Sequence, residues 1–342
     1  MKGILIVNLG STEAPTPEAV KPFLDEFLMD KYVFDFPYWL RSLIVRGIIL
    51  KTRPEKAAEA YQKIWWEEGS PITVISHRIH EKIQRSVDLP VSLAMRYGKP
   101  NIKAGLKELS DKGVNQVFLM GLYPQYAMST VGTVEAFANK AVQDDFPNMN
   151  LTFLPPFYDN PGFIDNISST IDKELDGFDY DCLLFSYHSL PLRHLRKTDK
   201  TGKHRNIKFR DDKYCCKPGS EESRYCYRTQ CMETTKFIVE KLEIPEEKYI
   251  TTFQSRLGVD KWITPFTADK IKELAHKGVK KLAIVAPSFV ADCVETLEEL
   301  GIEAEEDFIE NGGEELKLVP CLNDNEEWIK TLVGEINKWH QN

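Results

Sequence analysis

The sequence lacks both glycine-rich patterns by which many α/β proteins bind nucleotides. No Gly-x-Gly-x-x-Gly follows an apolar run, and no phosphate loop ends in Gly-Lys-Ser/Thr. Such loops hold phosphates on backbone N–H groups at the start of a helix. Nucleotide use therefore has little support, and the Gly10-Ser11-Thr12 stretch is at best a weak anion-binding signal.

An excess of positive charge is also missing. The chain has 44 Lys and Arg against 52 Asp and Glu, which gives a net charge of -8. Proteins that bind polyanions usually carry a basic surface. We therefore expect no nucleic-acid partner.

No apolar run is long enough to span a bilayer. The most lipid-like segment, residues 36–50, contains Arg41 and Arg46 and is shorter than the roughly 20 residues that a span requires. The apolar start at residues 4–9 is short, contains Asn8 and lacks a small-residue cleavage site. We expect a cytoplasmic protein whose segment 36–50 touches the inner face of the membrane without crossing it.

The seven cysteines are unevenly distributed. Four of them, Cys215, Cys216, Cys226 and Cys231, fall within one short stretch. This pattern favours a local metal or cluster site over a disulfide framework, and a reducing cytosol lowers the expectation of disulfides further.

Short apolar runs alternate with longer amphipathic stretches, which predicts an α/β fold with parallel sheets. Each run is almost continuously apolar, as expected for strands that helices cover on both faces. The runs are Gly3–Leu9, Val91–Met95, Val117–Leu122, Leu151–Leu154, Cys182–Tyr187, Ile250–Phe253, Leu282–Ala286 and Leu316–Val319.

The two halves of the chain resemble each other. Residues 107–114 (KELSDKGV) recur as residues 272–279 (KELAHKGV), and Met95-Arg96-Tyr97-Gly98 is echoed at residues 255–258. We expect two similar doubly wound, Rossmann-like domains with four-stranded sheets, at 1–150 and 151–325, followed by a C-terminal helix at 326–342. Ligands of such sheets bind at the carboxyl ends of the strands, here in a cleft between the domains.

Titratable residues follow two of the expected strands in the second half. His188 ends the fifth run, and Asp292 and Glu295 lie three apart in the helix expected after the seventh. An imidazole with carboxylates suits proton transfer or a borderline divalent ion such as Fe²⁺. The alternative is that the histidine is held by a backbone group and that the acids complement a helix dipole. Glu298 and Glu299 are expected to be solvated surface.

Four motifs resemble the signatures of ferrochelatases, in order along the whole chain: YPQYAMST (123–130), FSYHSLP (185–191), FQSRLGVDKW (253–262) and FVADCVETLEEL (289–300). This resemblance implies a two-domain chelatase fold. It also implies a lyase that inserts Fe²⁺ into protoporphyrin IX to give protohaem, the last step of haem biosynthesis, with porphyrin and ferrous iron as its partners.

The same resemblance assigns roles to residues. His188 and Glu295 match the metal-handling pair on either side of the porphyrin, and Asp292 matches a carboxylate that leads away from it. The residues that match the lining of the porphyrin pocket are Leu9, Arg96, Tyr97, Tyr123 and Trp262. Where relatives often have a histidine, this chain has Cys293, which puts a proton relay through that side chain in doubt.

The polar insert at about 194–231 resembles one that holds a [2Fe–2S] cluster in some bacterial ferrochelatases. Cys215, Cys216, Cys226 and Cys231 would supply the four thiolates that such a cluster uses. However, many of those relatives have a further cysteine where this chain has Arg205, and Met128 stands where another cluster-bearing branch has one. A [2Fe–2S] cluster, a zinc ion and a metal-free loop all remain open.

Three other functions stay open. The substrate is either protoporphyrin IX, which the lipophilic segment 36–50 favours, or coproporphyrin III. A related chelatase would load cobalt or nickel into another tetrapyrrole. A non-catalytic carrier would bind the ring without producing a metalloporphyrin.

Overall fold

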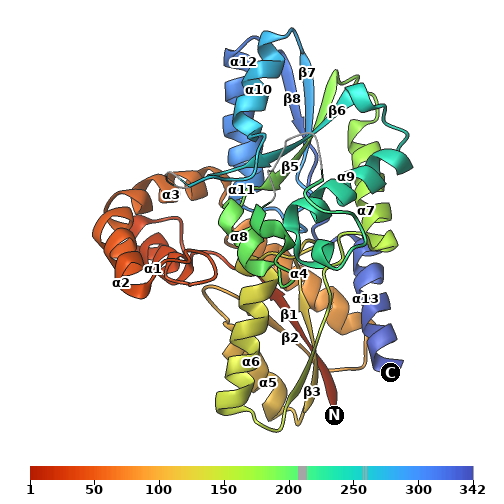
Figure 1. Ribbon diagram of the computed structural model, residues 1–342. Helices are drawn as coiled ribbons and strands as arrows, with labels where there is room; N and C mark the ends of the chain where they lie inside the picture. The colour runs from red at the N-terminus through yellow and green to blue at the C-terminus, as the bar shows by residue number, and fades with distance from the viewer. Residues whose placement is uncertain (207–213, 257, 259, 342) are drawn as a thin grey trace.

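The computed structural model describes residues 1–206, 214–256, 258 and 260–341, which form two lobes (Figure 1). Each lobe contains a parallel four-stranded sheet, with strand orders β2-β1-β3-β4 and β6-β5-β7-β8. All eight expected strands are confirmed to within one residue at either end. Their bounds are Lys2–Asn8 (β1), Val91–Met95 (β2), Gln116–Gly121 (β3), Asn150–Phe153 (β4), Cys182–His188 (β5), Tyr249–Gln254 (β6), Lys281–Val285 (β7) and Glu315–Leu318 (β8).

Both faces of each central strand are buried, as the continuous apolar runs predict. In β1, Ile4 and Ile6 belong to one hydrophobic cluster, whereas Leu5 and Val7 belong to another on the opposite face. The first cluster continues into the second lobe, where it includes Phe185 of β5. A shared core therefore joins the two sheets.

The strand orders confirm the internal similarity of the halves. β1 lies between β2 and β3, and β5 lies between β6 and β7 in the same arrangement. Asn8 pairs with Met95 at the end of β1, and His188 pairs with Gln254 at the end of β5. The two strand ends are thus equivalent, and the second carries the titratable group.

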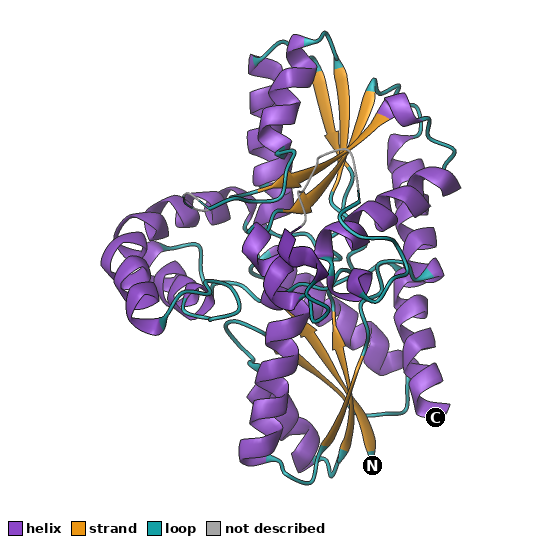
Figure 2. Cartoon of the chain, viewed as in Figure 1, coloured by secondary structure: helices purple, strands orange, loops and turns teal. Residues whose placement is uncertain are grey.

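Helices cover the sheets, and α1, α2 and α3 form a separate projection beside the two lobes (Figures 1 and 2). The helices of the described residues are Pro17–Leu28 (α1), Tyr38–Ile44 (α2), Leu50–Ile64 (α3), Pro71–Ser86 (α4), Ile102–Asp111 (α5), Thr133–Asp145 (α6), Pro161–Leu175 (α7), Leu192–Thr198 (α8), Tyr227–Lys241 (α9), Thr267–His276 (α10), Val294–Leu297 (α11), Ala304–Glu310 (α12) and Glu326–Gln341 (α13); π-helical turns occupy Val45–Ile49, Met128–Gly132 and Glu299–Glu303.

The C-terminal helix α13 packs against both lobes. Its Trp339 ring stacks on Phe118 of β3 in the first lobe at a centroid distance of 5.2 Å. Its Trp328 ring contacts Phe163 of α7 in the second lobe at 6.0 Å. The helix was expected at 326–342 and is observed at Glu326–Gln341, with residue 342 outside the described part of the chain.

The lipophilic segment 36–50 folds as α2 and the π-helical turn that follows it. Tyr38, Trp39, Leu43 and Ile48 leave 61–68% of their surface exposed in this segment. Among the described residues, no helix has both the length and the apolar character needed to cross a bilayer.

Candidate active site

His188 is the last residue of β5 and is partly buried in a cavity lined by strand ends of both lobes. Its Nδ1 lies 2.7 Å from the carbonyl oxygen of Ser189. Because a carbonyl oxygen can only accept, Nδ1 donates and the lone pair of the neutral ring stays on Nε2. Burial lowers the pKa of His188 below its ordinary value of 6.5, although the charge of Glu295 opposes this shift. The imidazole is therefore neutral and able to accept a proton at pH 7.

Glu295 lies in the first turn of α11 and lines the same cavity as His188. Its backbone carbonyl accepts a hydrogen bond of 2.8 Å from Nε2 of Gln254, the residue paired with His188 in the sheet. The Oε1 of Gln254 in turn accepts from the Ser186 hydroxyl at 2.8 Å. Gln254 thus fixes α11, which carries Glu295, relative to β5, which carries His188. The sequence motif that contains Gln254 did not indicate this role.

A mainly apolar cavity of about 150 Å³ contains both side chains and receives residues from the strand ends of both sheets. Leu9, Tyr123 and Trp262 line it, as expected for the pocket residues. The Tyr123 hydroxyl is buried and has no hydrogen-bond partner among the described residues. This cavity is smaller than the roughly 300–1,000 Å³ of typical ligand sites, so a large ring requires the adjoining space as well.

A second cavity of about 500 Å³ adjoins the first at Leu9 and Glu295. It has an acidic wall formed by Glu295, Glu298, Glu299 and Glu303. A third cavity of about 140 Å³ meets the first at His188 and Trp262. The apolar cavity is therefore continuous with a carboxylate-lined space on the side of Glu295.

The expectation that Glu298 and Glu299 are solvated surface is wrong. The chain packs α11 against α3, so Glu298 is buried and forms a 2.7 Å ion pair with Lys63 of α3. Burial, with a contribution from the charge of Glu295, raises the pKa of Glu299 to about 7. This contact could not be predicted from local pattern, because Lys63 is 235 residues away from Glu298 in the chain.

Asp292 does not share a helical face with Glu295, because α11 begins only at Val294. Its carboxylate accepts hydrogen bonds from the side chain of Asn323 at 2.7 Å and from the backbone N–H of Cys321 at 3.2 Å. It is buried and is not among the described residues that line the cavities above. The observed contacts therefore give Asp292 a loop-anchoring position.

Arg96 and Tyr97 also lie behind the cavity wall and do not line it in the described structure. Arg96 forms a buried ion pair with Asp30, and the Tyr97 hydroxyl donates to the same carboxylate at 2.9 Å. The Tyr97 ring packs edge-on against Phe27, at a centroid distance of 5.0 Å. Phe27 itself lines the cavity, so Tyr97 contacts the pocket wall through it, and the Arg96 guanidinium lies over the Tyr97 ring at 4.4 Å.

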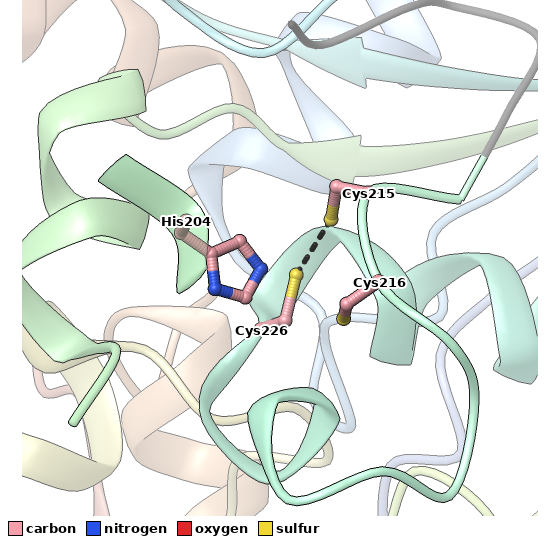
Figure 3. A group of neighbouring side chains, drawn as sticks. All are labelled: His204, Cys215, Cys216 and Cys226. Carbon is pink, nitrogen blue, oxygen red and sulfur yellow. Dashed lines mark hydrogen bonds between the residues drawn. The ribbon is translucent and has the colours of Figure 1, made fainter. Parts of the chain in front are cut away.

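The insert brings together a donor set that differs from the expected one. One ligand atom from each of His204, Cys215, Cys216 and Cys226 lies within 4.8 Å of all the others (Figure 3). Cys231 is not part of this group; it is buried in α9, where its thiol contacts the Tyr227 side chain. Positions 207–213 of the insert lie outside the described residues.

This arrangement does not fit a [2Fe–2S] cluster held by the four cysteines. Such a cluster has two irons, so ligands of different irons stand farther apart than the ligands of one tetrahedral ion. The four atoms instead form one compact group in which an imidazole takes the place of the fourth thiolate.

Comparisons with solved structures support the two-lobed fold. The chain is similar to SirB from Bacillus subtilis with Fe³⁺, with a TM-score of 0.55 and 10% identity over 98% of this chain and 94% of that one. A similar match, with a TM-score of 0.51 and 9% identity over 98% and 94%, is the sirohydrochlorin chelatase SirB from B. subtilis subspecies spizizenii in complex with cobalt. At these identities the likeness concerns the fold.

Sequence comparisons identify the family. The family model described as Ferrochelatase matches residues 1–339. A ferrochelatase of Pseudomonas putida (strain W619) is 47% identical over 98% of both chains, and one of Pseudomonas fluorescens (strain SBW25) is 46% identical over 96% of this chain and 95% of its own length. Together with the imidazole and carboxylate that line one cavity, these matches show that this chain belongs to the ferrochelatase family.

Proposed function

We propose that this ferrochelatase-family lyase inserts Fe²⁺ into protoporphyrin IX, with His188 as the base that accepts protons from the ring. The observation that carries this assignment is the neutral, partly buried imidazole whose Nε2 lone pair is left free for a proton by the Nδ1–Ser189 bond. Fe²⁺ and porphyrin are substrates here. No step of the proposal passes through a metal held by the insert.

The reaction releases two protons for each metal ion inserted. The two pyrrole N–H bonds of the porphyrin break, both electron pairs stay on nitrogen, and Fe²⁺ binds the resulting dianion. His188 receives a proton through Nε2 as a general base. Glu295 lies at the junction with the acidic cavity, where it can pass protons outward or guide hydrated iron inward.

Glu299 is suited to the next proton transfer. It lies on the wall of the acidic cavity, and its pKa of about 7 lets it both accept and release a proton near neutral pH. Asp292 acts as a positioning residue, because it anchors the loop before α11 to Asn323.

The porphyrin is held by the apolar walls of the pocket. Leu9, Tyr123 and Trp262 offer apolar and aromatic surface to a flat macrocycle. Tyr97 supports this wall from behind through Phe27, and Arg96 supports Tyr97. Walls that favour a bent ring would expose its nitrogen lone pairs, which is how binding energy assists the metal insertion step.

Protoporphyrin IX is the favoured substrate because the cavity is mainly apolar and this ring has fewer carboxylates than coproporphyrin III. The decisive experiment is anaerobic incubation of the enzyme with Fe²⁺ and either ring, followed by the product spectrum. Faster conversion of protoporphyrin supports the proposal. Preference for coproporphyrin would contradict the substrate, and binding without metalloporphyrin formation would contradict the enzymatic role.

We propose further that α2 and the following π-helical turn contact the inner face of the cell membrane, while the rest of the protein faces the cytoplasm. Four exposed apolar side chains in one short segment favour a peripheral contact. The net charge of -8 supports the absence of a nucleic-acid partner.

The division into domains remains a proposal as well. We propose domains at 1–150 and 151–325, each built on one sheet, followed by the C-terminal helix at 326–342, of which Glu326–Gln341 is described as α13. A boundary at 150 passes through β4, Asn150–Phe153, which pairs with β3 of the first sheet. The first unit therefore extends a few residues beyond the expected boundary.

A further inference from the structure

The insert contains a cluster of metal-binding side chains to which the proposed mechanism assigns no role. His204 comes from the short 3₁₀ turn Lys203–Asn206. Cys215 and Cys216 are adjacent residues later in the insert, and Cys226 occupies the N-cap position of α9. In Figure 3 the four side chains point toward a common centre, with the sulfur atoms of Cys215 and Cys226 2.7 Å apart. Four donors from three separate segments thus converge.

The imidazole of His204 is oriented as in a metal ligand. Both ring nitrogens are buried without a hydrogen bond of good geometry within the described residues, but Nδ1 lies 3.0 Å from Oδ2 of Asp199, whereas Nε2 has no such neighbouring carboxylate there. Asp199 is itself held by the backbone N–H groups of Thr201 at 2.8 Å and His204 at 2.6 Å. A carboxylate that fixes one ring nitrogen while the other faces the ion is the usual outer contact of a metal-binding histidine.

The surroundings of the sulfur atoms also favour thiolates. The hydroxyl of Thr229, in the first turn of α9, lies 3.3 Å from the Cys215 sulfur and 3.1 Å from the Cys216 sulfur. The positive end of the α9 dipole begins at Cys226. Both features stabilise negative charge on the cysteines, which is the form that binds a metal.

We propose that His204, Cys215, Cys216 and Cys226 bind one structural Zn²⁺ ion. The Cys215 and Cys226 sulfurs are 2.7 Å apart and no two ligand atoms are more than 4.8 Å apart, so the separations lie on either side of the edge of about 3.8 Å for a tetrahedron with metal–sulfur bonds of about 2.3 Å. Three cysteines and one histidine are a common set for closed zinc sites, which have no open position for a substrate.

The ion stabilises one wall of the active-site cavity. Directly after the ligand Cys226, Tyr227 lines that cavity. In the next turn of α9, Gln230 accepts a hydrogen bond of 2.7 Å from the backbone N–H of Tyr126. Thr234 accepts from Gln125, another residue that lines the cavity, at 3.1 Å. Zinc at the start of α9 therefore fixes the helix that supports both segments.

The test measures metal content in the whole protein, purified without porphyrin. We expect one zinc per chain, no visible absorbance, and loss of the zinc in His204→Ala and Cys226→Ser. Cys231→Ala is the matched control, since it removes a buried cysteine of the same helix outside the group, and it should retain the zinc. His188→Ala should also retain it, which separates this site from the reaction centre and makes the result independent of the proposed function.

A second measurement does not require the variants to fold. The wild-type protein, freed of metal by a chelator under reducing conditions, is titrated with Co²⁺, and one equivalent should produce the thiolate-to-cobalt charge-transfer band and the intense d–d bands of a tetrahedral site. Zinc removal should also accelerate amide hydrogen exchange in 124–127 and 222–231. Two irons with acid-labile sulfide, a Cys215–Cys226 disulfide in the purified protein, or no bound metal would each overturn the zinc assignment. Unchanged exchange would overturn the link to the cavity wall.

Discussion

Replacement of His188 by alanine gives the most direct test of the proposed chemistry. The change removes the Nε2 acceptor while leaving Leu9, Tyr123 and Trp262 in place along the cavity. A positioned general base typically contributes about 10²–10⁴-fold to a rate, which corresponds to about 3–5 kcal/mol of transition-state stabilisation. We therefore expect turnover to fall by at least about a hundredfold, with porphyrin affinity changed far less because the apolar walls remain.

The assay follows metalloporphyrin formation anaerobically and measures ring binding separately by quenching of porphyrin fluorescence. His276→Ala is the matched control, because His276 lies exposed at the end of α10, and it should leave both quantities unchanged. Turnover of His188→Ala within a factor of about two of wild type would remove the base assignment. Equal losses in binding and turnover would instead indicate a role in holding the ring.

The pH dependence provides a second view of the same group. Because burial holds the pKa of His188 below 6.5, the neutral, active form predominates at pH 7 and above. The rate of the wild-type enzyme should fall as the pH drops below 6.5 and this ring takes up a proton, and the fall should be absent from the residual rate of His188→Ala. An identical acid limb in both proteins would assign it to another group.

Three further predictions concern the acidic cavity and the exposed segment. Glu295→Gln should reduce turnover at least about tenfold in steady-state assays; if Glu295 merely complemented its helix dipole, the change would instead cost about 0.3–1 kcal/mol of stability and little activity. The folded-state pKa of Glu299 is about 7 against an ordinary 4.5, so ionisation of this carboxyl destabilises the fold increasingly from pH 4.5 to pH 7. In urea titrations, Glu299→Gln should therefore raise the free energy of unfolding at pH 8 by at most about 3 kcal/mol and should give no gain at pH 4.5. An equal gain at both pH values would contradict this reasoning. Trp39→Ser combined with Leu43→Ser should weaken binding to anionic lipid vesicles about tenfold in sedimentation assays without changing turnover in detergent, whereas unaltered sedimentation would argue against the membrane contact.

The architecture could be predicted from the sequence because its determinants are local. Continuous apolar runs of four to seven residues, such as Ile4–Val7 in β1, are buried on both faces and therefore signal a covered parallel strand. The repeated KELxxKGV segments revealed the duplication that the matching strand orders confirm. His188 could be selected because it ends a buried strand, and Glu295 because it lies in the helix expected after the next-to-last strand.

The surroundings of the site could not be predicted, because they depend on distant partners. Nothing in the helical pattern of residues 294–303 shows that Lys63 of α3 covers Glu298. Asp292 is drawn into the loop by Asn323, 31 residues later. The insert has no periodic pattern, so its sequence does not show that His204 folds against the cysteines. Cys231 was predicted as the fourth ligand only because it is the fourth cysteine of this stretch.

The contacts of α13 restrict how the molecule can open. A hinge motion that separated the lobes would have to break the Trp339–Phe118 stacking or uncover the buried Trp328, and loss of a buried tryptophan contact typically costs several kcal/mol. The projection formed by α1–α3 lies away from this helix (Figure 1), and it carries Phe27 and Arg53 of the cavity walls. The lobes are thus held together by α13, whereas the cavity wall that the projection supplies is held by its own ion pairs, Arg96–Asp30 and Lys63–Glu298.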